Sequence, residues 1–221
     1  MSGVHAVSES WPAFPPISPW CHSPWKRAFD LLSALLLLIP GLPLMLVVAL
    51  LVKASSRGPI LFCQKRLGEN GREFSLVKFR TMRHRKHAGG PGVTRSGDLR
   101  ITPVGGWLRQ WKLDELPQLF HLLAGQMSLV GPRPDLADFF AGLPPAELAV
   151  LRLRPGITGW ATLHFRFEEE LLAQVPAAGL REFYVRQVLP VKIRLDLEYA
   201  TRASFLADLR VLFATLSAIA R

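Results

Sequence analysis

Two adjacent carboxylates, Asp114 and Glu115, lie in the stretch KLDELPQLFHLL of a chain whose formal charge is +10. A proline is tolerated in the first turn of a helix, and a glycine is common just beyond its last residue. Pro117 and Gly125 therefore predict a helix over residues 116–124, with both acids at its N terminus. One acid is enough to cap a helix, so capping leaves the second carboxylate unexplained.

The position of this pair favours ionised carboxylates. The helix dipole and the free N–H groups stabilise negative charge, and Arg109 and Lys112 are close in the sequence. Adjacent acids cannot flank one bond from opposite sides, which disfavours the separated acid and base of a glycosidase. They can divide the work of phosphoryl transfer, one carboxylate attacking phosphorus while its neighbour binds a divalent ion such as Mg²⁺.

Two arginine-proline turns supply candidate phosphate ligands. In GPRP, Arg133 stands between Pro132 and Pro134, whose rings restrict the backbone and favour an extended conformation. A guanidinium held in this way suits bidentate binding of phosphate, although a rigid structural turn explains the motif equally well. The later RPGITG begins at Arg154 and repeats the pattern, so Arg154 is a second candidate.

A β-hairpin is predicted between these motifs and the N-terminal third of the chain. Residues 60–64 and 74–82 read as two short strands, and glycine and asparagine residues between them favour a turn. Side chains alternate across a strand, so Lys78 and Arg80 share one face. Such a pair is usually solvated, but here it also offers two cations to a phosphate. With the predicted helices, the hairpin indicates a mixed α/β module.

The composition limits the classes of function. The 221 residues are 49% hydrophobic, which is enough for one domain with a core. The excess of 27 Lys and Arg over 17 Asp and Glu predicts attraction to phosphates, whether of nucleic acid, anionic lipid or a small substrate. Cys21 and Cys63 are too few for a disulfide framework or a metal cluster, which fits a reducing compartment.

A membrane segment is the strongest physical signal in the chain. Residues 31–52 carry no charge, and as a helix they would extend about 33 Å, enough to cross the hydrocarbon core of a bilayer. Pro40 and Pro43 lie in the middle, where proline removes a backbone donor, so we expect the helix to break there. A kinked spanning helix and a re-entrant segment both fit this pattern.

The charges around the apolar run favour the re-entrant segment. Basic flanks stay on the cytoplasmic side, and here both flanks are basic. The cations are Lys26 and Arg27 before the run and Lys53, Arg57, Lys65 and Arg66 after it. The sequence therefore predicts a mobile Pro-rich tail over 1–25, a re-entrant helix-break-helix over 26–57 and a catalytic domain over 58–221. The amphipathic C-terminal stretch either packs in the core or lies at the membrane interface.

Six motifs in one order carry a resemblance to a known family. They are KRAFDLLSALLLL, GPILFCQKRLG, VKFRTM, LRQWKLDELPQL, MSLVGPRP and RPGITG. Together they resemble the bacterial sugar transferase family, the monotopic phosphoglycosyl transferases, from about residue 26 to the C terminus. The resemblance implies a helix-rich α/β cytosolic catalytic domain with one re-entrant membrane helix and interfacial amphipathic helices.

The resemblance also implies an activity. Such enzymes transfer a sugar-1-phosphate from a UDP-sugar to a polyprenyl phosphate, usually undecaprenyl phosphate, as the first membrane step of glycan assembly. By resemblance, Asp114 is the nucleophile that forms a phosphosugar-enzyme intermediate and releases UMP, and Glu115 helps to bind Mg²⁺. The residues that match the family's basic positions around the phosphates are Lys78, Arg80, Arg109 and Arg133.

By the same resemblance we expect a minimal family member, monotopic at the cytoplasmic face of a bacterial inner membrane. Membrane lipids are then partners, nucleic acid is not, and a homodimer is left open. Three positions depart from the family pattern: His121 where Asn is common, Gln126 where Asp is usual, and Thr162 where Gln is usual. Leu42 and Pro43 occupy the place of the Ser-Pro pair at which the family's membrane helix bends.

The rival hypothesis is a membrane-tethered scaffold or nucleic-acid-binding protein. It explains the positive charge and the anchor. It leaves the paired acids and the arginine between prolines unexplained, and the sequence carries no zinc, helix-turn-helix or base-stacking signature. Dependence of an activity on Asp114 separates the two hypotheses.

Overall fold

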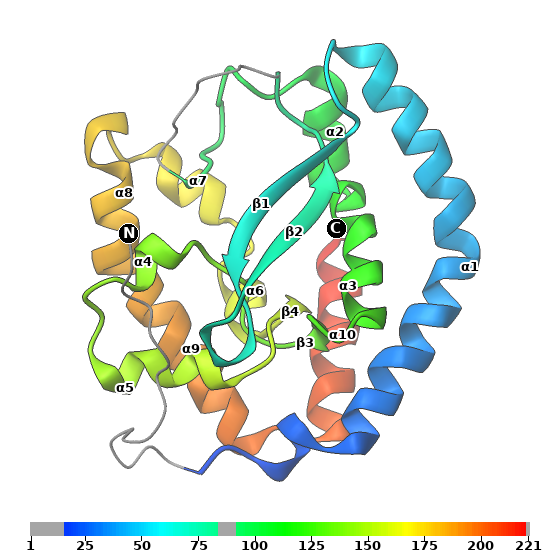
Figure 1. Cartoon of the computed structure of the whole chain (residues 1–221). Helices are drawn as coiled ribbons and strands as arrows, with labels where there is room; N and C mark the ends of the chain where they lie inside the picture. Colours follow the sequence, from blue (N-terminus) through cyan, green and yellow to red (C-terminus); the bar gives the residue numbers. More distant parts are fainter. Residues whose placement is uncertain (1–15, 84–91, 220–221) are drawn as a thin grey trace.

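The computed structural model of the chain describes residues 16–83 and 92–219. It is a helix-rich α/β fold, as predicted, in which two small sheets lie among the helices (Figure 1). The α-helices are α1 (Pro24–Ser55), α2 (Pro103–Gln110), α3 (Leu119–Leu123), α4 (Ala137–Phe140), α5 (Pro145–Leu148), α6 (Trp160–His164), α7 (Glu168–Ala173), α8 (Leu180–Phe183), α9 (Leu189–Arg202) and α10 (Phe205–Ile219). Shorter helical turns are η1 (Pro19–His22), η2 (Glu69–Gly71), η3 (Leu113–Gln118), η4 (Ala149–Arg152), η5 (Ala177–Gly179) and the π-helical η6 (Tyr184–Val188).

The predicted hairpin is confirmed, with ends that differ by a few residues. β1 (Leu61–Leu67) and β2 (Glu73–Phe79) pair antiparallel, and η2 forms the turn between them. In the register Phe62 lies opposite Lys78 and Cys63 lies opposite Val77. A second sheet joins β3 (Ser128–Val130) and β4 (Gly156–Thr158) in parallel. Gly131 follows β3 directly, where an added Cβ would lie 2.4 Å from the Arg154 carbonyl oxygen, so only glycine permits this approach.

The apolar run forms one continuous helix, so the predicted break in the helix is wrong. Helical structure runs through Pro40 and Pro43, and Figure 1 shows α1 bowed, with both ends turned toward the body of the protein. A proline costs one backbone hydrogen bond and bends a helix, but it does not end the helix where the surrounding turns remain bonded.

One face of α1 is buried along its whole length. The buried residues recur every three or four positions, as one face of a helix requires: Ala34, Leu38, Gly41, Met45, Val48 and Val52. Part of this face packs with Phe79 of β2, Leu108 of α2 and Leu119 of α3 in a single apolar cluster. The remaining faces of α1 expose large apolar side chains: Leu32, Leu35, Leu36, Leu37, Ile39, Leu42, Leu46 and Leu50.

The first turns of α1 are bound to the rest of the protein by polar contacts. The Lys26 ammonium lies 2.7 Å from Asp208 of α10 and 3.4 Å from Asp30 of α1, and all three side chains are buried. Arg27 donates a hydrogen bond of 2.9 Å to the Leu123 carbonyl at the end of α3. These two cations, which the sequence placed in a basic membrane flank, therefore bind other parts of the protein.

The end of the predicted mobile tail is also bound. Residues 1–15 lie outside the described part of the chain, but Ser18 donates backbone and side-chain hydrogen bonds to Ala200 at 2.9 Å and Ala203 at 2.7 Å. The η1 turn follows, and α1 begins at Pro24, so residues 18–25 of the predicted tail take part in the fold.

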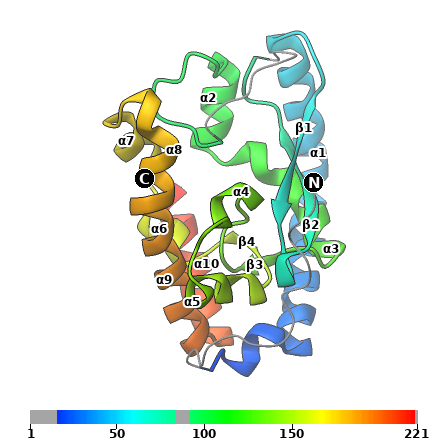
Figure 2. The ribbon, with the colours of Figure 1, turned by 60° about the vertical axis from the view of Figure 1, so that its left-hand side comes forward.

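Three apolar clusters form the core. One joins α1 to β2, α2 and α3, and a second joins β2, α3 and β3 to Val211 of α10. The third gathers around α9 and η6, on the side of the molecule that is nearer in Figure 2. The candidate site is formed by η3 and by the residues that follow β3.

Candidate active site

The two adjacent acids lie in the first turn of a helical segment. Helical structure extends from Leu113 to Leu123, first as the 3-10 turn η3 and then as α3. The observed helical segment therefore begins three residues before the predicted start at residue 116. Lys112 precedes it in the left-handed conformation with φ 55°, and Gly125 follows it with φ 76°. The tight 3-10 turn results in Asp114 being only 4% exposed.

Asp114 is less acidic than the sequence suggested. Burial of its carboxyl group and the nearby charge of Glu115 raise its pKa to about 6, although Lys78, Arg109 and Lys112 act in the opposite direction. The expectation that both acids are fully ionised therefore needs correction for Asp114. Above about pH 6 the carboxylate predominates, and it is a stronger nucleophile than a carboxylate with an ordinary pKa.

Glu115 is held in the ionised form by Arg133. The Arg133 guanidinium donates a hydrogen bond of 2.7 Å to Oε1 of Glu115, whose side chain is 10% exposed. Burial alone would raise the pKa of Glu115, but Arg133 and the neighbouring lysines lower it to about 2. The same contact raises the pKa of Arg133. Pro132 and Pro134 flank this arginine, as the predicted stiff turn requires.

Lys78 completes the group of cations around the acids. It lies near the end of β2, where burial lowers its pKa to about 8 and the charge of Asp114 partly restores it. Arg109 and Arg133 repel it and Glu115 attracts it, so these five side chains share one electrostatic environment. The structure therefore brings Lys78, Arg109 and Arg133 to the acids, as the sequence predicted.

Arg109 also has a partner that the sequence did not suggest. Its guanidinium forms a close ion pair with Glu169 of α7 and lies 3.5 Å from the Thr81 hydroxyl. Three consecutive glutamates, residues 168–170, begin α7, where the helix dipole stabilises negative charge. In the sequence, this run of three acids is the feature that could have predicted a partner for Arg109.

Arg80 and Arg154 lie elsewhere. The Arg80 guanidinium donates to the Ser56 carbonyl at 2.7 Å and to the Val52 carbonyl at 3.3 Å, so it caps the C terminus of α1. Arg154 pairs with Glu69 in the hairpin turn at 3.0 Å. Arg80 does not share the position of Lys78, because it lies one residue beyond β2 and its guanidinium is held by carbonyl groups at the C terminus of α1.

The sequence analysis did not predict a buried network of polar side chains that begins at Asp135, two residues after Arg133. Asp135 binds Arg66 at 3.3 Å and accepts from the Tyr184 hydroxyl at 3.1 Å. Lys192 of α9 then contacts that hydroxyl at 3.2 Å and Glu168 at 2.6 Å. Two ionisable residues, Lys192 and Asp196, on the buried face of α9 are the signal that marked this network.

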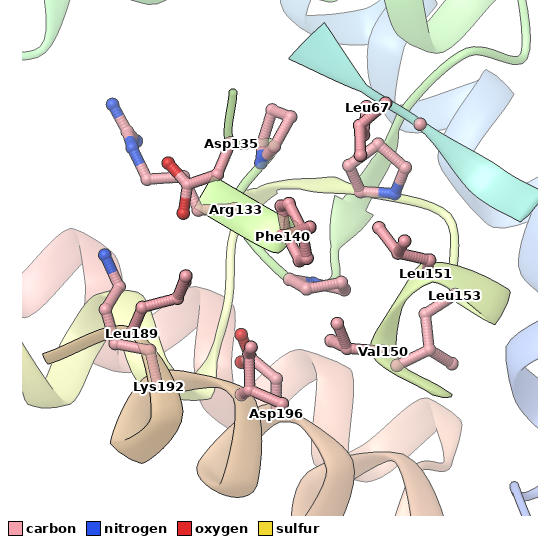
Figure 3. Close-up of a pocket in the computed structure, with 15 residues that line it drawn as sticks. Leu67, Arg133, Asp135, Phe140, Val150, Leu151, Leu153, Leu189, Lys192 and Asp196 are labelled. Atoms are coloured by element: carbon pink, nitrogen blue, oxygen red, sulfur yellow. The ribbon is translucent and has the colours of Figure 1, made fainter. Parts of the chain in front are cut away.

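A pocket lined by Asp135 and Lys192 lies beside this network. In Figure 3, Arg133 and Asp135 lie on one side of it, while Lys192 and Asp196 rise from α9. Burial raises the pKa of Asp196 to about 7, so its carboxyl group is partly protonated near neutral pH. The rest of the lining is largely apolar, including Val150, Leu151 and Leu153.

The acid pair offers oxygen ligands to a cation. Within residues 16–83 and 92–219, no group of three His, Cys, Asp or Glu side chains forms a closed metal cage. Mg²⁺ does not need one, since it binds through one or two carboxylates and completes its shell with water and phosphate oxygens. The low pKa of Glu115 keeps one carboxylate available at any physiological pH, so the donor set fits such an ion.

Comparison with known proteins identifies the family. The sequence model for "Bacterial sugar transferase" matches residues 21–221, nearly the whole chain. This chain belongs to the bacterial sugar transferase family. The match spans helix α1, the acid pair and the α9 network, which are therefore parts of one family unit.

Several characterised relatives have names that state a reaction. Undecaprenyl-phosphate glucose phosphotransferase of Komagataeibacter xylinus is 40% identical over 209 residues, which cover 91% of this chain and 36% of that protein. A UDP-glucose:undecaprenyl-phosphate glucose-1-phosphate transferase of Caulobacter vibrioides is 38% identical, with 88% and 69% covered. Exopolysaccharide production protein PSS of Rhizobium leguminosarum bv. phaseoli is 38% identical, with 86% and 92% covered. The chain spans only about two fifths of the first three sugar-phosphate transferases it matches.

Proposed function

We propose that this bacterial sugar transferase transfers a sugar-1-phosphate from a UDP-sugar to undecaprenyl phosphate, the first membrane step of exopolysaccharide or related glycan assembly. The observation that carries the proposal is the buried pair of Asp114 and Glu115 among Lys78, Arg109 and Arg133. Four of the matched relatives, including the Caulobacter vibrioides protein, carry the name UDP-glucose:undecaprenyl-phosphate glucose-1-phosphate transferase. The sugar that this chain uses is a separate question, which a panel of UDP-sugars addresses.

The proposed chemistry has two steps. The Asp114 carboxylate attacks the β-phosphorus of the UDP-sugar, an oxygen-phosphorus bond forms, and the bond to the bridging oxygen breaks so that UMP leaves. An oxygen of the lipid phosphate then attacks the same phosphorus and displaces the Asp114 carboxylate. The products are UMP and a polyprenyl diphosphate sugar, and the enzyme is regenerated without any change of oxidation state.

The side chains around Asp114 reduce the charge repulsion in both steps. Two anions must approach each other, so the cations Lys78, Arg109 and Arg133 stabilise the charge that accumulates on the phosphoryl oxygens. Glu115 remains ionised and holds Mg²⁺, which supplies further neutralisation of the diphosphate when it is bound. Burial of Asp114 removes water from the nucleophile, which limits hydrolysis of the intermediate.

We also propose that the protein is monotopic, at the cytoplasmic face of the inner membrane. The support is the buried stripe of α1, from Ala34 to Val52, which packs on the catalytic domain and leaves both helix ends on the side of that domain. In contrast, a helix that crosses a bilayer by itself would be surrounded by lipid over its middle and could not pack there on the catalytic domain. The exposed apolar residues of α1, and Phe213 and Leu216 of α10, then face lipid.

The topology is tested by cysteine labelling in intact spheroplasts. Cysteines placed beside Lys26 and Lys53 should both resist a reagent that cannot cross the membrane, and both should react after lysis. Labelling of one flank from outside would show that α1 spans the membrane.

The reaction is tested by trapping the intermediate. The protein is incubated with a UDP-sugar that carries its label in the sugar, without lipid acceptor, and we expect label on the protein together with UMP. Asp114→Asn should abolish attachment, because the amide is nearly isosteric but is not a nucleophile. Asp138→Asn is the matched control, since Asp138 is an exposed acid of α4 that pairs with Arg181 on the surface.

Two outcomes would contradict the covalent route. One is turnover by Asp114→Asn, and the other is kinetics that require both substrates to be bound together. Either result would make Asp114 a metal ligand or a base in direct transfer. Absence of any transfer with every UDP-sugar, together with binding of nucleic acid, would favour the rival scaffold hypothesis.

A further inference from the structure

His121 lies in α3, about two helical turns beyond the acid pair, and its ring is bound on three sides. Nε2 accepts a hydrogen bond of 3.0 Å from the Val77 backbone N–H in β2. Nδ1 lies 2.6 Å from Oε1 of Gln126. The edge of the Phe74 ring packs against the imidazole at 5.4 Å and an interplanar angle of 73°. The residue is 8% exposed.

These contacts determine the tautomer. A backbone N–H can only donate, so Nε2 carries no proton. A neutral imidazole then has its proton on Nδ1, where it donates to the Gln126 side-chain oxygen. Gln126 therefore fixes His121 in the one neutral form that can accept from Val77.

Within the part of the chain that the structure describes, the Val77 N–H faces an edge of β2 that pairs with no strand. One edge of β2 pairs with β1, where Val77 lies opposite Cys63, and its N–H on the other edge goes to His121. The next residue along β2 is Lys78, which lies among the site charges. The imidazole thus joins the strand that carries Lys78 to the helical segment that carries Asp114.

Gln126 is also tied to His121 through the backbone. The N–H groups of Gln126 and Met127 both donate to the His121 carbonyl, at 3.0 and 3.2 Å, across the turn at Gly125. His121 and Gln126 are two of the positions at which the chain departs from the family pattern. The structure shows that these two departures contact each other, so they form one unit rather than two independent changes.

We propose that His121, oriented by Gln126, is a positioning residue for the transfer reaction: it fixes the β2 main chain at Val77 and thereby holds Lys78 beside Asp114 and Glu115. This inference rests on the proposed function, because it assumes that Lys78 assists the transfer. His121 itself does not touch substrate or the reacting atoms, and its effect is transmitted through the strand.

Substitutions at His121 can separate its two bonds. The amide oxygen of Gln reaches the place of Nε2, whereas an Asn side chain ends near the place of Nδ1. His121→Gln should therefore keep the bond to Val77 and most of the turnover. His121→Asn should lose it, and we expect kcat to fall about tenfold with little change in the KM for the lipid phosphate. Gln126→Met removes the acceptor that orients the ring and should resemble His121→Asn.

A double-mutant cycle tests whether His121 acts through Lys78. Once Lys78→Met has removed the ammonium group, adding His121→Asn should cause no further loss of kcat, because the two changes disable the same element. If the fold-loss of kcat in the double variant equals the product of the two single losses, the proposal is overturned, since that result would indicate general damage to the fold. Equal turnover of His121→Gln and His121→Asn would overturn the proposal as well. If Lys78→Met turns over too slowly to be measured, this comparison of the two His121 variants is the deciding test.

The outcomes distinguish this inference from the proposed function. If the wild-type protein acquires no label from a UDP-sugar, or Asp114→Asn retains turnover, the proposed chemistry fails whatever the His121 variants do. If labelling depends on Asp114 but the cycle is multiplicative, the chemistry stands and the positioning role of His121 fails alone.

Discussion

Replacing Lys26 by methionine tests whether α1 is docked on the catalytic domain by buried charge. Lys26 lies 2.7 Å from Asp208 and 3.4 Å from Asp30, and its side chain is 8% exposed. The two carboxylates are 1% and 0% exposed. Methionine preserves the length of the stem and removes the charge, so two buried carboxylates would face each other without a cation.

The magnitude follows from that burial. Breaking a buried ion pair by removing one partner costs about 3–5 kcal/mol, because the remaining charge is uncompensated. In a protein of this size each kcal/mol corresponds to about 2–4 °C in the unfolding midpoint, so we expect Lys26→Met to lower it by about 6–20 °C. Both acids also accept hydrogen bonds from other groups: Asp30 from the Leu129 N–H at 3.0 Å and Asp208 from the Trp20 side chain at 3.1 Å.

The assay is thermal unfolding of the purified protein in nanodiscs, with two comparison variants. Lys53→Met removes an exposed cation from the other end of α1 and should shift the midpoint little. Adding Asp30→Asn and Asp208→Asn to Lys26→Met should restore part of the loss, because the orphaned charges are removed. A midpoint for Lys26→Met that matches that of Lys53→Met would refute this account of how α1 is held.

Three further predictions follow from the site. Glu115→Gln should preserve the fold but reduce turnover about a hundredfold or more, because an amide is a poorer ligand for a hard cation, and full activity in EDTA would contradict the metal role. Asp196 has a pKa of about 7 against an ordinary 3.8, so the folded state binds the extra proton and the free energy of unfolding should fall as pH rises between these values. Asp196→Asn should flatten that slope in chemical unfolding curves and be more stable than wild type at pH 8. Arg80→Met should cost about 1–3 kcal/mol of stability through the lost cap of α1 yet leave labelling of Asp114 intact, and loss of labelling in a folded variant would return Arg80 to the phosphate site.

Local chemistry was readable from the sequence. Gly125 marked the end of a helical segment, because the left-handed conformation is a local preference, whereas Pro117 placed its start three residues too late. The hairpin followed from alternation and turn residues in the same way. Asp114 and Glu115 stood out because no local role accounts for two adjacent acids in a basic chain.

The partners of charged side chains were decided by the tertiary structure. Lys78, Arg80 and Arg154 looked alike as candidates, yet Lys78 lies beside the acids, Arg80 caps α1, and Arg154 binds the hairpin turn. A long side chain takes whichever acceptor the fold brings within reach, and that acceptor is often far away in the sequence. No periodicity or spacing encodes that choice.

Burial and its consequences for charge also required the fold. The sequence placed Asp114 at a helix N terminus, where its charge is stabilised, but packing excludes water from it and raises its pKa. Likewise, Pro40 and Pro43 predicted a break, while contacts along α1 maintain one bowed helix. His121 and Gln126 appeared as separate departures until the turn at Gly125 brought them together.

The sequence alone determined which groups could do the chemistry, because side-chain type and backbone preference are local properties. Only the tertiary structure decided which of those groups meet and how acidic they are, because both depend on which distant segments pack together and how much water they exclude.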